Sequence, residues 1–191
     1  MRACRPSGPN VALDRENALT WHPARPPRPK MTPQIEIEPI SEQERDVLWH
    51  YLQFYIYDMA QFTGARPNKG VFAYGPFDAY WRGDERRTAW WLKLGGEIAG
   101  FALVRLDDGD GRREIAEFFI LNRWRRRGAG LAFARALLVR WPGPWKLHEL
   151  ANNVGAIAFW RCVLQGFARY SEVRRDHPDG IGRIEQRFDV S

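Results

Sequence analysis

Three consecutive arginines precede two glycines in the segment WRRRGAGLAFARAL, which occupies residues 124–137. The apolar spacing that follows them predicts a helix that begins near Gly128. The free N–H groups and the dipole of a helix start attract anions, and a glycine lets a phosphate approach the backbone where a Cβ would block it. Arginine adds paired donors that match phosphate oxygens. The segment therefore predicts a cradle for the pyrophosphate of a cofactor.

The spacing of this segment disfavours a nucleic-acid patch and two well-known phosphate-binding turns. A nucleic-acid patch would spread basic residues over a face together with groups that read bases, whereas this cluster is confined to one turn. A dinucleotide-binding turn needs Gly or Ala where Phe133 stands and follows the first strand of a domain. A Walker loop does not occur in the sequence. A solvated basic helix start, with glycines that serve only the turn, stays open as the alternative.

Two short motifs resemble those of a known family. Residues 125–130 (RRRGAG) fit the pattern [QR]-x-x-G-x-[GA], and residues 153–160 (NVGAIAFW) fit N-x-x-A-x-x-F-[YW]. In this order and setting they are similar to the motifs of the GNAT superfamily of acyl-CoA-dependent N-acetyltransferases. The order of predicted elements over residues 34–190 also resembles that fold, so the resemblance covers nearly all of the chain after its first 30 residues.

The resemblance implies that acetyl-CoA is the co-substrate and that it lies where two neighbouring strands splay apart. The pantetheine arm would pair with the main chain of Phe118, Phe119 and Ile120. Asn153 would help to hold this arm, and Phe159 would pack beside it. Plain core packing is an alternative role for the phenylalanines. The pyrophosphate would sit on the cradle residues, which are Arg125, Arg126, Arg127, Gly128, Ala129 and Gly130.

Acetyl transfer to an amine requires a base, because an alkyl ammonium with a pKa of about 10.4 has no free lone pair at neutral pH. We expect Glu117 to be this base, since it is a carboxylate amid apolar residues of the strand that leads into the cradle. A structural ion pair is the alternative for Glu117. Glu114 is the second candidate, because a bulge in this strand would change which face each residue occupies.

The sequence assigns no acid to the departing thiolate of coenzyme A. Many members of the family carry a tyrosine where this chain has Trp160, and an indole cannot act as an acid. The reaction is still expected, because a thiol with a pKa of about 8.5 gives a tolerable leaving group. Tyr170 is a substitute donor, with packing as its alternative role. His50 and His148 show no partners in the sequence, and we expect structural roles for both.

In the family, the segment between the first helix and the next strands usually borders the acceptor pocket. An aromatic wall there would suit an apolar or ring-containing amine or an organic cation. Packing under the helix accounts for the same residues equally well. The aromatic residues of this segment are Tyr74, Phe77, Tyr80 and Trp81.

An alternation of strands and helices must position these groups. A helix with Ser41 as its N-cap is expected to run to about Phe62, a second covers Gly128 to Trp141, and a third covers residues 154–164. This order indicates an α/β or α+β fold, and the resemblance implies a central mixed, mostly antiparallel sheet flanked by helices. Strand patterns occur at 34–40, 88–94, 97–106, 114–121, 145–150, 167–174 and 183–190.

The composition predicts one domain at residues 31–191 after a disordered, Pro/Arg-rich extension at residues 1–30. The extension holds six of the 29 Lys and Arg but two of the 23 Asp and Glu, so the net charge of +6 falls to +2 for residues 31–191. Translation from Met31 is an alternative start. The absence of a signal sequence or long apolar run favours a soluble, cytoplasmic protein. Cys4 and Cys162 support neither a disulfide framework nor a metal site.

The leading hypothesis is an N-acetyltransferase that uses acetyl-CoA on a small-molecule or peptide amine, by direct attack with a carboxylate base. Neither nucleic acid nor a membrane is an expected partner, and a homodimer is one possible assembly. The alternative is a non-catalytic acyl-CoA-binding module of the same fold, in which Trp160 marks lost chemistry. An RNA-associated protein that uses the basic extension and the arginine cluster is the third hypothesis.

Overall fold

The computed structural model describes residues 34–83, 86–167 and 169–191. The predicted disordered extension at residues 1–30, the alternative start at Met31 and Cys4 lie outside the described residues. Within the described ranges, no helix combines the length and the apolar character that crossing a membrane requires.

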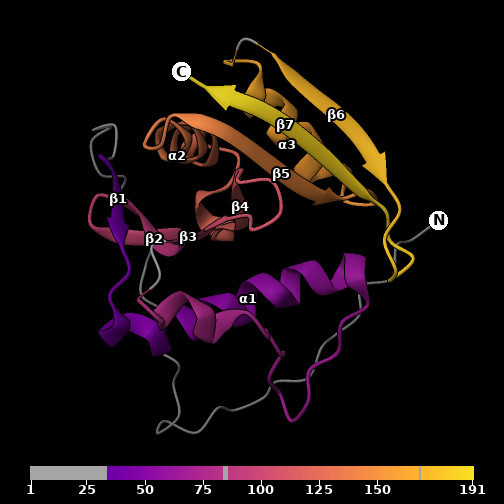
Figure 1. The fold of residues 1–191 in the computed structure, drawn as a ribbon. Coiled ribbons are helices and arrows are strands. Elements are labelled where there is room, and N and C mark those ends of the chain that lie inside the picture. The colour runs from indigo at the N-terminus through magenta and orange to yellow at the C-terminus, as the bar shows by residue number, and fades with distance from the viewer. Residues whose placement is uncertain (1–33, 84–85, 168) are drawn as a thin grey trace, which may run out of the picture. The chain divides into compact units, whose positions relative to one another are not determined.

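A seven-stranded sheet in the order β1-β2-β3-β4-β5-β7-β6 forms the centre of the described chain (Figure 1). The β4–β5 pair is parallel and every other neighbouring pair is antiparallel, which confirms the predicted mixed, mostly antiparallel sheet. All seven predicted strands are present. They are β1 (Ile35–Pro39), β2 (Arg87–Leu94), β3 (Glu97–Leu106), β4 (Arg113–Ile120), β5 (Gly143–Leu150), β6 (Tyr170–Arg175) and β7 (Arg183–Val190).

The three predicted helices are α1 (Arg45–Thr63), α2 (Ala129–Leu138) and α3 (Val154–Leu164). Before α1, the N–H and hydroxyl of Ser41 both donate to the carboxylate of Glu44, so Ser41 begins this helical segment as predicted. The prediction that the second helix reaches Trp141 is wrong, because α2 already ends at Leu138. Trp141 precedes a proline, and that position is biased away from the helical conformation.

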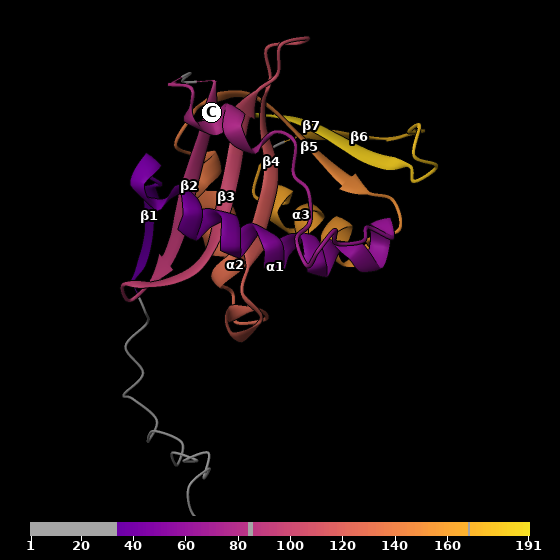
Figure 2. The ribbon, with the colours of Figure 1, turned by 90° about the horizontal axis from the view of Figure 1, so that it is seen from below.

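Helix α1 packs on one face of the sheet, and α2 and α3 pack on the other face (Figure 2). On the first face, Leu48 and Leu52 of α1 are fully buried against Phe101 of β3 and Phe119 of β4. On the second face, apolar side chains of α2 and α3 pack against β4, β5 and β7. Each such fully buried side chain contributes about 1.5–3 kcal/mol, so the two layers hold the sheet between them.

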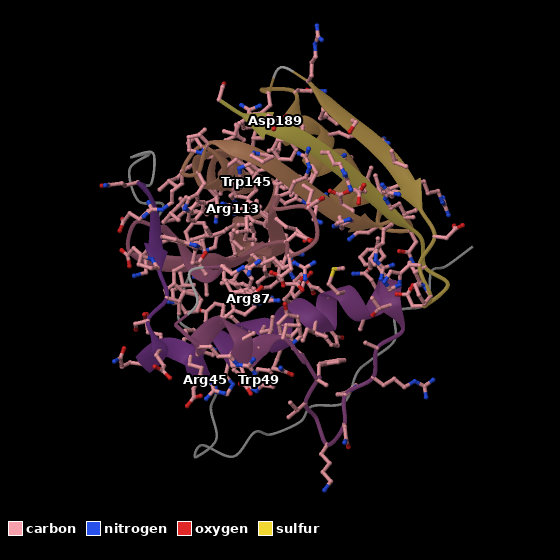
Figure 3. The ribbon with its side chains drawn as sticks, in the orientation of Figure 1. Arg45, Trp49, Arg87, Arg113, Trp145 and Asp189 are labelled. Carbon is pink, nitrogen blue, oxygen red and sulfur yellow. The ribbon has the colours of Figure 1, made fainter. Side chains whose placement is uncertain are left out.

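The predicted aromatic segment forms a short 3-10 turn, η2 (Phe77–Trp81), at the α1 face. Phe77 and Tyr80 are buried in the cluster under α1, and the ring of Phe77 lies 4.9 Å from that of Trp49, which Figure 3 labels. Of the two roles that the sequence left open for this segment, packing under the helix therefore holds for Phe77 and Tyr80.

Strands β4 and β5 pair at their first residues and then diverge. Arg113 pairs with Trp145 and Glu114 with Lys146, and no later residue of β4 pairs with β5 in the described part of the chain. The guanidinium of Arg113 lies 6.0 Å from the ring centroid of Trp145 at this closed end (Figure 3). The expected splay of two neighbouring strands is confirmed.

A β-bulge interrupts β4 just after this point. Leu103 of β3 pairs with Glu117 whereas the next residue, Val104, pairs with Ile115, so Ala116 is the extra residue. In an unbroken strand, residues three apart point to opposite faces. The bulge instead places Glu114 and Glu117 on the same face, the one that α1 covers.

Candidate active site

The divergence of β4 and β5 opens a cleft with a volume of about 540 Å³. Tyr55 and Met59 of α1 line it from one face of the sheet, and Ala156 and Trp160 of α3 line it from the other. The turn between β6 and β7 also contributes to its wall. Side chains from both helical layers of the fold therefore line the cleft.

Glu117, the predicted base, lies in this cleft with its carboxylate held by two tyrosines. The hydroxyl of Tyr74 donates to Oε1 at 3.0 Å, and the hydroxyl of Tyr55 donates to Oε2. Burial raises the pKa of Glu117 to about 7, although the two tyrosine hydrogen bonds act in the opposite direction. Burial also raises the pKa of both tyrosines, so they remain donors. Glu117 can thus exchange a proton near neutral pH.

Glu114, the second candidate, has a different environment on the same face. It is 4% exposed and forms an ion pair with Arg105 at 2.8 Å and a hydrogen bond with His148 at 3.1 Å. Burial alone would raise the pKa of Glu114, but His148 and Arg105 together lower it below its usual value. Its oxygens are engaged by Arg105 and His148, so of the two carboxylates Glu117 is the better suited to accept a proton.

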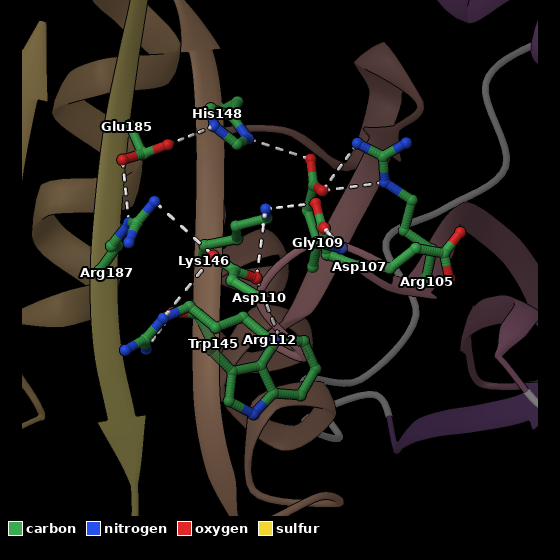
Figure 4. Close-up of polar contacts among 12 residues, drawn as sticks. Arg105, Asp107, Gly109, Asp110, Arg112, Trp145, Lys146, His148, Glu185 and Arg187 are labelled. Atoms are coloured by element: carbon green, nitrogen blue, oxygen red, sulfur yellow. Dashed lines mark hydrogen bonds and ion pairs between the residues drawn. The ribbon is translucent and has the colours of Figure 1, made fainter.

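His148 bridges two carboxylates on neighbouring strands (Figure 4). Its Nδ1 lies 3.1 Å from Glu114 of β4, and its Nε2 lies 3.0 Å from Glu185 of β7. The hydrogen bond with Glu114 is the main reason why the pKa of His148 is raised, although burial opposes the shift. The structural role expected for His148 agrees with these contacts, and the partners themselves are not visible in the sequence.

Further ion pairs surround this bridge at the closed end of the cleft (Figure 4). Lys146 pairs with Asp107 and lies 3.5 Å from Asp110, both in the turn between β3 and β4. Arg187 of β7 lies 3.6 Å from Asp110 and 2.9 Å from Glu185. The network therefore ties β5 and β7 to the β3–β4 turn at the point where the strands begin to diverge.

The residues predicted to form the cradle lie in the loop after β4 and at the start of α2. Gly128 has a φ of 81°, in the left-handed region, and precedes the first turn of α2. Arg126 has a φ of 56°, a conformation that non-glycine residues adopt rarely and that clusters at functional sites. Arg126 and Arg127 are exposed. An added Cβ at Gly130 would lie 3.4 Å from the ring of Phe159, tighter than most contacts.

The side chain of Arg125 turns away from this helix start toward α1. Its guanidinium forms a 2.6 Å ion pair with Asp58 and donates to the carbonyl of Ile120 at 2.6 Å. It also lies 5.3 Å from the ring centroid of Phe119. The side chain of Arg125, the first residue of the motif, thus links the cradle loop to α1, whereas its backbone N–H remains part of the loop.

Of the residues expected to contact pantetheine, Phe118 and Asn153 are among the described residues that line the cleft. Phe118 lines the cleft and stacks on Phe159 at 5.8 Å, whereas Phe119 and Ile120 are buried on opposite faces of β4. Because β5 does not pair here, this edge of β4 leaves alternate N–H and C=O groups unpaired with another strand. The side chain of Asn153 caps α3 by accepting the N–H of Ala156 at 3.0 Å.

Tyr170 and His50 are not among the described residues that line the cleft, whereas Trp160 is. Tyr170 is on the edge strand β6 opposite Phe188 and is not among the described residues that line the cleft. His50 is exposed on α1. Trp160 is buried, lines the cleft and packs its ring 5.3 Å from that of Phe118.

The roles of Tyr55, Tyr74 and Glu149 are not apparent from the sequence. Tyr55 fits the apolar stripe of α1 and Tyr74 fits an aromatic wall, yet both hold Glu117. Glu149 of β5 does not stand out in the sequence, although it is buried and lines the cleft. The alternation of WKLHEL could have indicated that Glu149 faces the apolar side of its strand.

Comparison with solved structures gives several of the same fold. The ribosomal-protein-S18-alanine N-acetyltransferase from Escherichia coli is 18% identical, with a TM-score of 0.55 over 83% of this chain and 95% of that one. Spermidine N-acetyltransferase from Vibrio cholerae, solved with CoA and spermine, is 10% identical, with a TM-score of 0.60 over 82% and 96%. An aminoglycoside acetyltransferase solved with coenzyme A is 20% identical, with a TM-score of 0.57 over 80% and 94%.

Comparison with curated protein sequences gives no significant match. A family model, in contrast, matches residues 51–163, more than half of the chain, and spans the sheet centre, the cradle and most of α3. That match includes both sequence motifs and Glu117. The chain therefore belongs to the acetyltransferase (GNAT) family.

Proposed function

We propose that this chain transfers the acetyl group of acetyl-CoA to an amine, with Glu117 as the general base. The observation that carries the proposal is a carboxylate held by two tyrosine hydroxyls in a cleft between diverging strands. With a pKa of about 7, Glu117 is substantially deprotonated at neutral pH and can accept the proton that an ammonium must lose.

The residues of the cleft fit acetyl-CoA, which supplies an acetyl group activated as a thioester. The unpaired edge of β4 at residues 118–120 offers main-chain groups to the pantetheine arm. The start of α2 offers free N–H groups to the pyrophosphate, with Arg126 and Arg127 exposed beside it. A Cβ at Gly130 would point at the side chains of Phe159 and Ile120, so this glycine lets the start of α2 pack closely against them.

Direct attack by the amine is favoured over an acetylated enzyme. Among the described residues that line the cleft there is no cysteine or serine that could carry the acetyl group. Cys162 is exposed on α3. Glu117 would take the amine proton, and Tyr55 and Tyr74 would hold its carboxylate in place.

The acceptor is an amine of a small molecule or a peptide. The solved structures of the same fold include enzymes for a ribosomal-protein alanine, for spermidine and for an aminoglycoside, which supports an amine acceptor without selecting one. The alternative function is a non-catalytic acyl-CoA-binding module, which the indole of Trp160 at the family's tyrosine position favours.

The test is release of free thiol from acetyl-CoA with a panel of polyamines, aminoglycosides, amino acids and peptides with free N-termini. We expect at least one amine to accelerate thiol release in the wild type and to do so far less in Glu117→Gln. Binding of acetyl-CoA by calorimetry without acceleration by any amine would support the module instead. Absence of both binding and turnover would overturn the proposed function.

A further inference from the structure

Glu149 is a buried carboxyl group in the wall of the cleft. It is 4% exposed, and among residues 34–83, 86–167 and 169–191 neither of its oxygens has a hydrogen-bond partner. Strand alternation places it on the α3 side of β5, with Leu147 and Trp145, where Ala156 and Trp160 line the same cleft. A buried polar group of this kind is costly unless it is neutral or serves a ligand.

The charges of His148 and Arg161 act to lower the pKa of Glu149, but both residues are bound to other carboxylates and do not outweigh its burial. Arg161 of α3 is engaged by Glu172 of β6 at 3.0 Å, and the side-chain amide of Gln186 of β7 also donates to Glu172, at 2.8 Å. His148, on the same strand, points to the other face and is bound by Glu114 and Glu185. Burial, followed by repulsion from Glu172, raises the pKa of Glu149 to about 8. At neutral pH the group is therefore mostly a carboxylic acid with a proton to donate.

We propose that Glu149 is the general acid that protonates the sulfur of coenzyme A as the acetyl group leaves it. This role rests on the proposed function, and it is the role that the indole of Trp160 cannot fill. When the carbon–sulfur bond breaks, sulfur keeps the electron pair and takes the proton of Glu149, which becomes a carboxylate. Glu117 releases the amine proton to solvent, and Glu149 regains a proton from solvent, so amine and thioester yield amide and thiol.

The energetics of this step suit the chemistry of a thiol. A thiol has a pKa of about 8.5, close to that of Glu149, so proton transfer between them is nearly balanced in free energy. The two carboxyls then divide the work by location: Glu117 faces α1 and accepts, whereas Glu149 faces α3 and donates.

The first test compares Glu149→Gln with the exposed control Glu42→Gln. Glutamine keeps the volume of the side chain but cannot transfer a proton. We expect Glu149→Gln to bind acetyl-CoA like the wild type and to lose about 100-fold in kcat, the low end for general acid catalysis because a thiolate is a tolerable leaving group. Wild-type kcat in Glu149→Gln with an unchanged pH profile would overturn the proposal.

A second test needs no substitution at Glu149 and no turnover. In the Glu117→Gln background, infrared spectroscopy should show a protonated carboxyl band that titrates near pH 8. Coenzyme A should shift this band, whereas the analogue that lacks the sulfur atom should not. Identical bands with both ligands would overturn the role of Glu149 while the proposed function stands. If coenzyme A does not bind at all, it is the proposed function that fails.

Discussion

The two faces of the cleft hold glutamates in opposite surroundings. On the α1 face, Glu114 and Glu185 are each bound by arginine and by His148, and these partners lower the pKa of both although burial would raise it. On the α3 face, Glu149 is equally buried but has no partner among the described residues, and its pKa is raised. Burial alone therefore does not decide whether the pKa of a carboxyl is raised or lowered here. The direction of the shift depends on whether the carboxyl has a cationic partner.

Glu117 stands between these two cases, because its partners are neutral hydroxyls. Tyrosines position its carboxylate without supplying the charge that would lock it in the ionised form. This difference separates carboxyls that hold the fold together from carboxyls that can exchange protons.

The largest effect is expected from Glu117→Gln. This change removes the group with a pKa of about 7 that we propose as the acceptor of the amine proton, so kcat should fall by about 10²- to 10⁴-fold at neutral pH. The wild-type rate should rise as pH increases through about 7, where Glu117 loses its proton, and the variant should lack that rise. Steady-state rates across pH check this, with the exposed Glu97→Gln as control. Equal activity of Glu117→Gln at every pH would remove Glu117 from the mechanism.

His148→Gln tests the partnered face. The pKa of His148 is higher in the folded protein than in the unfolded chain, where it is about 6.5. The contribution of the bridge to the free energy of unfolding is therefore complete below pH 6.5 and is lost as the pH rises through the pKa of the folded state. We expect the variant to lose about 2 kcal/mol of unfolding free energy at low pH, as for hydrogen bonds to charged groups, and less at high pH. Denaturant titrations at several pH values measure this difference. A difference that grows with pH would contradict the assignment.

Gly128→Ala tests whether the cradle affects acetyl-CoA binding independently of its effect on stability. The left-handed φ of 81° at Gly128 makes alanine cost about 1 kcal/mol, and the strained helix start should raise the KM for acetyl-CoA several-fold. Gly64→Ala is the matched control, since Gly64 has a φ of 69° at the end of α1 and an added Cβ there would meet nothing within 4 Å. The control should lose similar stability and keep its KM. An equal change of KM in both variants would argue against the cradle.

The smallest effect is expected from Tyr170→Phe. Tyr170 lies on the edge strand opposite Phe188 and outside the described cleft lining, so the hydroxyl should not serve as the acid. The rate and the pH profile should match those of the wild type. A substantial loss of kcat would transfer the role of Glu149 to Tyr170.

Strands and helices could be predicted from the sequence more completely than the contacts between side chains that are distant in the sequence. Apolar periodicity and turn residues located every strand and helix, because these signals are local. The bridge from Glu114 through His148 to Glu185 joins residues 34 and 37 positions apart, and nothing local encodes that contact. The two motifs indicated which residues would form the cradle, a role that stays a prediction, but the ion pair between Arg125 and Asp58 depends on how α1 lies on the sheet.

Side-chain roles are hardest to predict where one residue type serves two purposes. Tyr55 fits the apolar stripe of its helix and also binds Glu117, so periodicity reports only the first role. The sequence allows for a bulge in β4, but its position at Ala116 follows from the pairing with β3. That Glu149 has no hydrogen-bond partner among the described residues could not be predicted from the sequence, since it depends on all of its neighbours in space.

The bulge at Ala116 has a consequence for how the cleft comes into being. Bulges increase the local twist of a strand, and this one lies two residues after Glu114, the last residue of β4 that pairs with β5 in the described part of the chain. The backbone of the folded protein thus already holds the two strands apart. The free-energy cost of separating them is met during folding and not during ligand binding. An incoming thioester would meet a ready-made opening, so its binding should involve little rearrangement of the main chain.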